Sequence, residues 1–189
     1  MAEQAVEGGH VLISVGGSVA AYKACDVVTE LRRRGADVRV AMTDAATRFV
    51  STLLLRSLSG HRVAAGLWNA EDAEAEHGMP HIDLGGWAQV HVVVAASADL
   101  IARLALGLAD DAVTATALAS RAPLLVAPAM EAAMWEHPAT VSHVATLRSR
   151  GARLIGPVRG RLASGHEGFG RMAEPEAIVA AVEEAFAAR

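Results

Sequence analysis

The chain has 189 residues, of which 52% are hydrophobic and 20% are charged, and its formal net charge is −4. This length is typical of one domain, and the negative charge argues against a nucleic-acid partner. No apolar run approaches the roughly 20 residues of a membrane span, so we expect no membrane partner. The single cysteine, Cys25, excludes an internal disulfide and indicates a cytoplasmic location.

Apolar strand segments and helical segments alternate along the chain. We expect strands over residues 10–15, 37–42, 62–65, 90–95, 124–127 and 152–155. Helices are expected over 18–34, 98–106, 112–120, 141–150 and 174–188. One more helix is expected after the strand over 37–42, and it runs through Phe49 and Leu55. This pattern predicts an α/β fold over residues 1–189, a single Rossmann-like (flavodoxin-like) domain with a parallel sheet and helices on both faces. Residues 1–8 are polar and acidic, and we expect them to be disordered.

The stretch 156–172 differs from the rest of the chain. Within it, residues 156–170 contain five glycines, two arginines and a histidine, with too few apolar side chains to pack tightly. Such a composition predicts a flexible flap over a binding site.

The turn between the first strand and the first helix contains Gly16, Gly17 and Ser18. Backbone amides at a helix start, together with the Ser18 hydroxyl, can bind a phosphate; equally, Ser18 can serve only as a helix cap. The turn lacks the third glycine of a dinucleotide fingerprint and the Gly-Lys-Ser/Thr of a P-loop. One phosphate therefore fits this turn better than two.

The strand over 124–127 is followed by Pro128-Ala129-Met130-Glu131-Ala132-Ala133-Met134-Trp135. Open α/β sheets bind ligands beyond the carboxyl ends of their strands, so this octet predicts an apolar pocket with one carboxylate. A core helix whose methionines fill space is the alternative if the octet is taken alone.

The octet resembles the PxMNxxMW signature of the homo-oligomeric flavin-containing cysteine decarboxylases, which include phosphopantothenoylcysteine decarboxylase and the peptidyl-cysteine decarboxylases of lantibiotic biosynthesis. Further segments match that family in order, and the resemblance extends over residues 11–180. They are Gly17-Ser18-Val19-Ala20-Ala21-Tyr22-Lys23, Thr43 with Phe49, His81-Ile82-Asp83-Leu84, Ser97-Ala98-Asp99, Gly107-Leu108-Ala109-Asp110-Asp111, Leu162-Ala163-Ser164-Gly165 and Gly170-Arg171-Met172-Ala173-Glu174-Pro175.

The resemblance implies FMN as the cofactor, bound between protomers of a homotrimer or dodecamer. By the same resemblance the flavin contacts are Gly17, Ser18, Val19, Thr43, Ala45, Phe49, Ser97, Ala98, Asp99, Leu100 and Ala129. The substrate contacts implied are Glu131, Met134, Arg161, Leu162, Ala163 and Ser164.

His81 resembles the catalytic histidine of the family, and an imidazole can accept a thiol proton at neutral pH. A zinc site with His77 is disfavoured because Gly78 and Pro80 interrupt any helix that would align the two imidazoles. We therefore expect no metal. A histidine with a purely structural role is the alternative for His81.

Three positions depart from the family pattern. Ser164 stands where pantetheine-forming members carry a redox-active cysteine, which implies that the reaction stops at the enethiol. Glu131 replaces an asparagine that the resemblance places on the substrate carboxylate, and Asp99-Leu100 replaces Asn-Thr. Glu131 is either protonated, or replaced in its role by a group such as Arg161, or the substrate is not the usual one.

The sequence thus predicts FMN-dependent oxidative decarboxylation of the C-terminal cysteine of a ribosomally made precursor peptide, for thioether ring formation. The first alternative is phosphopantothenoylcysteine decarboxylase of coenzyme A biosynthesis. The second is a flavin-binding regulatory protein without catalysis.

Overall fold

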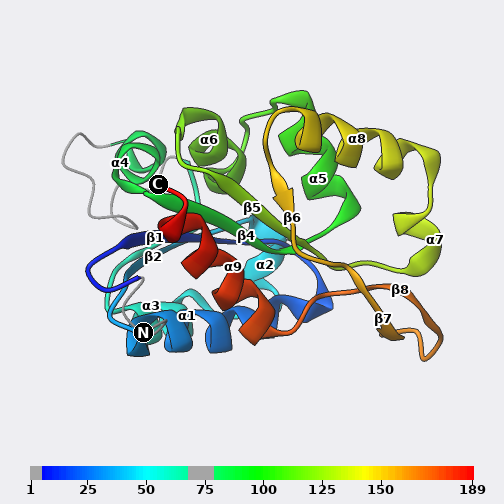
Figure 1. Ribbon diagram of the computed structural model, residues 1–189, viewed down its shortest axis with the longest axis horizontal. Coiled ribbons are helices and arrows are strands. Elements are labelled where there is room, and N and C mark those ends of the chain that lie inside the picture. Colours follow the sequence, from blue (N-terminus) through cyan, green and yellow to red (C-terminus); the bar gives the residue numbers. More distant parts are fainter. Residues whose placement is uncertain (1–5, 68–78) are drawn as a thin grey trace.

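A six-stranded parallel sheet forms the centre of the computed structural model, which describes residues 6–67 and 79–189 (Figure 1). The strand order is β3-β2-β1-β4-β5-β6. This order identifies the doubly wound, Rossmann-like sheet and confirms the expected α/β class. The strands are β1 (His10–Val15), β2 (Asp37–Met42), β3 (Val63–Ala64), β4 (Val90–Ala96), β5 (Leu124–Pro128) and β6 (Arg153–Leu154).

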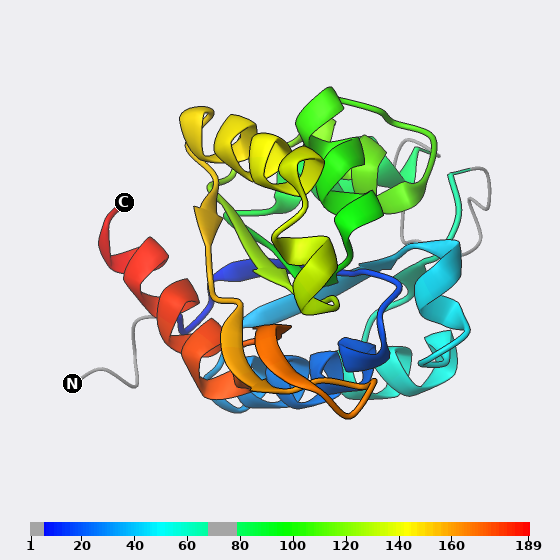
Figure 2. The ribbon, with the colours of Figure 1, turned by 90° about the vertical axis from the view of Figure 1, so that its right-hand side faces the viewer.

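Helices cover both faces of the sheet, as Figures 1 and 2 show. One layer contains α1 (Ala24–Arg33), α3 (Thr52–Ser59) and α9 (Pro175–Ala187). The other contains α4 (Pro80–Trp87), α5 (Ala98–Leu106), α6 (Ala112–Ala119) and α8 (Pro138–Ser149). Short helical turns follow three strands: η1 (Val19–Lys23), α2 (Asp44–Thr47) and α7 (Ala132–Trp135). In the described residues, no helix is both long and apolar enough to cross a bilayer.

Each face of the sheet has its own apolar core because successive side chains of a strand point to opposite faces. On β1, Val11, Ile13 and Val15 belong to the core beneath α1 and α9. Leu12, from the same strand, packs with Val93 in the core beneath α5 and α8. The central strands are buried on both sides, so their sequences are continuously apolar rather than alternating.

Two predicted helices begin differently from expectation. The helix expected over 18–34 starts as the 3-10 turn η1 and becomes an α-helix only at Ala24. The helix expected over 141–150 begins earlier, at Pro138, because proline at a first helical position requires no backbone N–H.

Residues 6–8, which we expected to be disordered, form a turn with Val6 buried, and the Gly8 amide donates to the Gly35 carbonyl at 2.9 Å. The remaining residues of that expectation, 1–5, lie outside the described part of the chain, as does His77.

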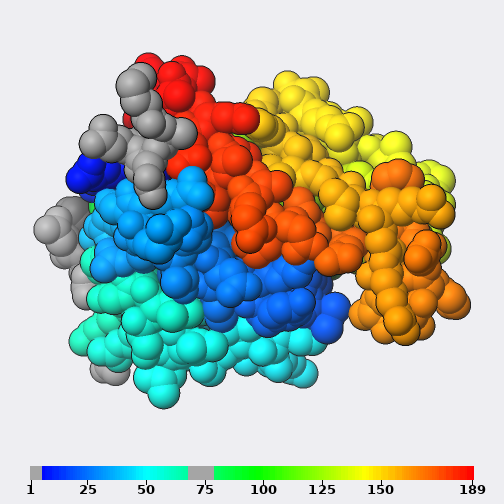
Figure 3. Space-filling model, turned by 60° about the horizontal axis from the view of Figure 1, so that its bottom comes forward, coloured from blue at the N-terminus to red at the C-terminus, as the bar shows by residue number. Residues whose placement is uncertain are grey.

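The glycine-rich stretch, which we expected to be a flexible flap, contains a hairpin. Strands β7 (Val158–Arg161) and β8 (Glu167–Arg171) pair antiparallel and separately from the main sheet. Figure 3 shows this hairpin, in orange, projecting from the body of the molecule. The Met130 amide donates to the Gly170 carbonyl at 3.0 Å, which joins the hairpin to the segment after β5.

Candidate functional site

The strand order reverses between β1 and β4, and the loops that leave these strands create a crevice there. The Gly16 amide donates to the Val94 carbonyl at 2.8 Å, so the loop after β1 lies against the carboxyl-terminal part of β4. A Cβ on Gly16 would lie 2.4 Å from the carbonyl oxygen of Ala95. Only glycine allows this approach, which explains one glycine of the predicted turn.

Ala95 carries backbone strain at the same place. Among the described residues it is the only non-glycine residue with a positive φ, 57°, and its side chain is fully buried. The pairing of β4 with β5 shifts register between Val93 and Ala96, which accommodates this conformation. Such strain costs about 1–3 kcal/mol and is concentrated at functional sites. The strained residue thus lies beside the crevice.

Three hydroxyl groups stand at the carboxyl ends of neighbouring strands. Ser18 follows β1, Thr43 follows β2 and Ser97 follows β4, and they cap η1, α2 and α5. Each oxygen accepts from a backbone amide, at 3.2, 3.1 and 3.2 Å, of Ala20, Ala46 and Leu100 respectively. Each hydroxyl hydrogen therefore stays available to donate to an anion at the strand ends.

The remaining predicted flavin contacts divide into two groups. Gly17 and Ala45 touch closely, since a Cβ on Gly17 would lie 2.3 Å from the Cβ of Ala45. By contrast, Asp99 is turned to the surface, where its carboxylate accepts from Arg103 at 2.9 Å, and Leu100 is buried in the core. Ala98 is the first residue of α5 and is partly exposed.

A cavity of about 510 Å³ opens between η1, the segment after β5 and the hairpin. Its lining includes seven predicted site residues: Ser18, Val19, Ala129, Glu131, Arg161, Leu162 and Ala163. It also includes residues for which no role was predicted, namely Ala20, Tyr22, Lys23, Met130, Gly170, Arg171 and Met172. All of these residues lie in segments on which the family resemblance rests. The sequence therefore indicated the segments but assigned no role to these individual residues. A volume of this size accommodates a cofactor or substrate.

The apolar character of the crevice fits an isoalloxazine ring. Val19, Tyr22 and Phe49 are 57%, 59% and 52% exposed, which is unusual for large apolar side chains. Ser18, Thr43 and Ser97 supply donors that suit a single phosphate. Phe49 is outside the lining of the cavity, and it stands on the loop that follows α2.

The basic groups of the crevice are unequally paired. The Lys23 ammonium lies 2.7 Å from Glu174, and Arg171 lies 2.5 Å from the other oxygen of the same carboxylate. The Lys23 ammonium, with Arg171 adding to it, lowers the pKa of Glu174 below its ordinary value. Arg161 has no ion-pair partner within the described residues.

Glu131 lines the cavity and contacts the tip of the hairpin. Its Oε1 accepts a hydrogen bond from the Ser164 amide at 3.4 Å. The side chain of Ser164 is exposed and does not line the cavity, and Met134 is 46% exposed on α7, also outside it. Of the predicted substrate contacts, Ser164 and Met134 therefore lie at the rim.

His81 is not brought to this crevice within one chain. It lies on α4, at the end of the molecule opposite to α7 and the hairpin (Figure 1). There it lines a separate cavity of about 360 Å³ together with Leu67, Ile82, Ala109, Ala115, Leu118 and Ala119. Its Nδ1 is buried and lacks a hydrogen-bond partner among the described residues. Within one chain, His81 and the predicted nucleotide pocket therefore line separate cavities.

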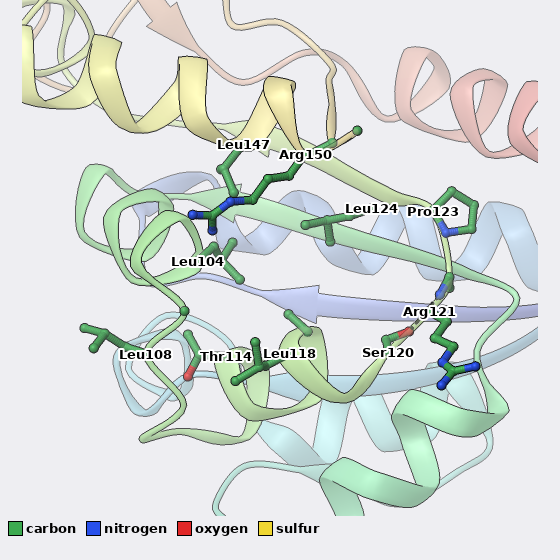
Figure 4. Close-up of a pocket in the computed structure, with 15 residues that line it drawn as sticks. Leu104, Leu108, Thr114, Leu118, Ser120, Arg121, Pro123, Leu124, Leu147 and Arg150 are labelled. Atoms are coloured by element: carbon green, nitrogen blue, oxygen red, sulfur yellow. Dashed lines mark hydrogen bonds between the residues drawn. The ribbon is translucent and has the colours of Figure 1, made fainter.

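A third cavity, of about 410 Å³, lies beside the start of β5 between α5, α6 and α8 (Figure 4). Arg150 extends across it and donates to the Ala105 carbonyl at 2.7 Å, near the end of α5. A cation at a helix C-terminus complements the helix dipole, so this arginine has a structural role. Ligands of open parallel sheets bind beyond the carboxyl ends of the strands, whereas this cavity lies at the amino end of β5.

The family model described as Flavoprotein matches residues 2–187, and the chain belongs to this family. The coenzyme A biosynthesis bifunctional protein CoaBC of Haemophilus influenzae is 41% identical over 181 residues, which are 96% of this chain and 44% of the relative. The chain thus spans less than half the length of that relative.

Two solved structures resemble the chain over nearly its whole length. The FMN-dependent cysteine decarboxylase SpaF has a TM-score of 0.81 and 31% identity, and the match covers 97% of this chain and 98% of SpaF. A Cys-to-Ser mutant of PPC decarboxylase, complexed with pantothenoylaminoethenethiol, has a TM-score of 0.81 and 34% identity, covering 94% and 98%. The expected cofactor, FMN, is thereby confirmed for this family of cysteine decarboxylases.

Among the described residues, no group of three histidine, cysteine, aspartate or glutamate side chains is arranged to hold a metal ion.

Proposed function

We propose that the chain catalyses FMN-dependent oxidative decarboxylation of the cysteine carboxylate of 4′-phosphopantothenoylcysteine. The observation that carries this proposal is the 41% identity to CoaBC over 96% of the chain. The similarity to a PPC decarboxylase with bound pantothenoylaminoethenethiol supports the same substrate class. The precursor peptide that the sequence first suggested becomes the second candidate.

The chemistry is shared between the cofactor and the chain. FMN supplies a hydride acceptor for the β-carbon of the substrate cysteine. His81 accepts the thiol proton, so that the sulfur can form a C=S bond as the hydride leaves. The resulting thioaldehyde is β to the carboxylate, the bond to the carboxylate breaks, and its electrons form an enethiolate with release of CO2.

Residues of the crevice bind and orient the reactants. Ser18, Thr43 and Ser97 donate hydrogen bonds to the flavin phosphate, while Val19 and Ala129 provide apolar surface for the ring system. The hairpin covers the cavity and excludes water from the substrate, which strengthens every charge interaction inside.

Ser164 determines where the reaction ends. A hydroxyl is a far weaker acid than a thiol and cannot act as a redox partner, so the enethiol is not reduced further and is the released product. The association of a Cys-to-Ser decarboxylase mutant with an enethiol in a related structure supports this step.

Mass spectrometry tests the proposal directly. The purified flavoprotein is incubated with phosphopantothenoylcysteine in air, and we expect a mass loss of about 46 Da, equal to CO2 plus two hydrogens. A loss of about 44 Da would instead indicate that the enethiol is reduced. An unchanged substrate would contradict the proposed substrate.

A peptide with a C-terminal cysteine is the second candidate, and the specific observation in its favour is Ser164. An enzyme that stops at the enethiol suits a product that later forms a thioether ring. The same mass measurement with peptides ending in cysteine distinguishes the two: the preferred substrate has the higher kcat/KM.

We further propose that the active site is completed by a second copy of the chain. His81 is separated from the crevice within one chain, and its surroundings expose Met79, Ile82 and Leu118, at 49%, 46% and 64%. Contact with another copy would bury these side chains and bring His81 to a neighbouring flavin. A homotrimer or a dodecamer would provide such contacts.

A further inference from the structure

Three basic side chains line the cavity, and only one of them forms no ion pair with another described residue. Lys23 and Arg171 both contact the carboxylate of Glu174, at 2.7 and 2.5 Å. Arg161 lines the same cavity, and no ion pair is formed by it within the described residues. A guanidinium is the group best suited to bind a carboxylate, because its paired N–H donors match the two oxygens.

Glu131 is the one carboxylate among the residues lining this cavity. A substrate carboxylate about 4 Å from an ionised Glu131 would lose roughly a thousandfold in affinity at an effective dielectric near 20. Glu131 makes a different contact, because its Oε1 accepts a hydrogen bond from the Ser164 amide. Its position therefore disfavours direct binding of the substrate carboxylate and favours a contact with the hairpin.

The hairpin turn connects these two residues. Arg161 is the last residue of β7, and the Leu162 amide donates to the His166 carbonyl at 2.8 Å to close the turn. Glu167 is opposite Arg161 in the hairpin register, but it lies outside the cavity, and the ion pairs found among the described residues do not join the two. Holding Ser164 consequently fixes the turn from which Arg161 extends over the cavity.

We propose that Arg161 binds the carboxylate of the substrate cysteine and that Glu131 is a positioning residue that holds the hairpin tip through the Ser164 amide. This inference rests on the proposed function, because it places the cysteine carboxylate in this cavity. It also revises the sequence-based role of Glu131 as a direct substrate contact.

Two unreactive ligands that differ only in the carboxylate test the role of Arg161. Phosphopantothenoylserine retains the carboxylate, and phosphopantothenoylethanolamine lacks it; neither has a thiol to oxidise. Calorimetry on the flavin-loaded protein should show that Arg161→Gln weakens binding of the serine ligand by at least about tenfold and of the ethanolamine ligand by less than about twofold.

Arg159→Gln is the matched control. Arg159 is on the same strand, opposite Phe169, and it does not line the cavity. We expect this variant to bind both ligands as the unmodified protein does. Equal weakening of both ligands by Arg161→Gln, or no weakening, would overturn the role of Arg161.

The role of Glu131 has a separate readout. Glu131→Gln removes the charge but keeps an acceptor oxygen, so it should preserve exchange protection of the Ser164 amide and tighten binding of the serine ligand severalfold. Glu131→Ala should abolish that protection. If the Ser164 amide exchanges equally fast in all three proteins, Glu131 does not hold the hairpin.

Failure of the proposed substrate is distinguishable from failure of this inference. If neither phosphopantothenoyl ligand binds the unmodified protein, the substrate proposal is wrong. Peptides ending in serine or in ethanolamine then provide the same carboxylate comparison, and a selective loss with Arg161→Gln would support its role for a peptide substrate. Absence of a selective loss there would overturn the inference too.

Discussion

Ser164 is the residue on which the product of the proposed reaction depends. Its amide contacts Glu131, while its hydroxyl is exposed at the hairpin tip, 3.5 Å from the Nδ1 of His166. The side chain stands at the rim of the cavity and outside the core. Changing its chemistry should therefore alter the reaction rather than the fold.

Ser164→Cys should convert the oxidative reaction into one without net oxidation, because a thiol is acidic enough to protonate the enethiol while the flavin reduced in the first half-reaction would supply the two electrons. We expect the mass loss to change from about 46 to about 44 Da while the rate of CO2 release stays within about threefold. Ser164→Ala is the control and should retain the larger loss. A cysteine variant that still yields only the enethiol would disprove the role of this position.

A second residue, His91, should make stability depend on pH. It is fully buried on β4, its Nε2 lies 2.7 Å from the Ser14 hydroxyl, and burial lowers its pKa from 6.5 to about 4. The unfolded chain binds a proton below about pH 6.5, whereas the folded protein resists it until about pH 4, so stability is full above that range and falls as the pH decreases through it.

The size of this effect follows from the shift, which corresponds to on the order of 3 kcal/mol. We expect urea unfolding to show a loss of about 2–3 kcal/mol between pH 7.5 and 4.5, and His91→Gln to remove most of it. The glutamine can still hydrogen-bond to Ser14. An identical pH dependence in the variant would mean that other groups cause the loss.

Some conformations and contacts of single residues could not be predicted from the sequence. Ala95 is an ordinary alanine in an apolar strand, and nothing in its neighbours predicts a positive φ. That conformation depends on the approach of Gly16 from another strand and on the register shift beside β5. Similarly, the family pattern did not indicate that Arg103 donates to the exposed carboxylate of Asp99, which stays a predicted flavin contact.

At the scale of secondary-structure elements, buried strands were the most predictable part. The bounds of β1 and β2 were predicted correctly because β1 is an almost continuously buried apolar run and β2 alternates partly buried polar residues with buried valines before its buried end. The hairpin was missed, since its few apolar residues give no pattern. Antiparallel pairing of β7 with β8 stabilises the hairpin. Close contacts of Gly168 and Gly170 with residues 130–132, which are distant in sequence, attach it to the rest of the protein.

Gly170 provides the test of how the hairpin is attached. It has a φ of 150°, and a Cβ there would lie 2.2 Å from the Met130 carbonyl oxygen. Gly170→Ala should detach the hairpin and speed tryptic cleavage at Arg159 or Arg161 by about tenfold, because local opening becomes easier. Binding of the serine ligand should weaken in parallel.

Gly165→Ala separates steric conflict from backbone strain. Gly165 also has a positive φ, 90°, but nothing lies within 4 Å of a Cβ built there. We expect this variant to be cleaved at close to the normal rate. Equal cleavage of both variants would indicate that backbone strain alone, rather than contact with Met130, controls the attachment.

At the scale of the whole molecule, the doubly wound sheet separates the crevice, which we propose binds the flavin, from His81, which we propose accepts the thiol proton. The crevice is at the carboxyl ends of β1, β2 and β4, whereas α4 carries His81 to the opposite end (Figure 1). The order of the motifs along the chain does not predict this separation, whereas the family resemblance, which implies FMN bound between protomers, agrees with it. Assembly of identical copies can unite the crevice and His81.

Complementation between two inactive variants tests this assembly. His81→Asn removes the base, and Gly17→Ala disrupts the flavin site, since its Cβ would lie 2.3 Å from that of Ala45. Each variant alone should be inactive, while random mixed oligomers should recover roughly one quarter of the activity, the share of sites that combine one intact His81 with one intact crevice. Size measurement of each oligomer controls for folding. Mixed oligomers of normal size without activity would require both groups to act within a single chain.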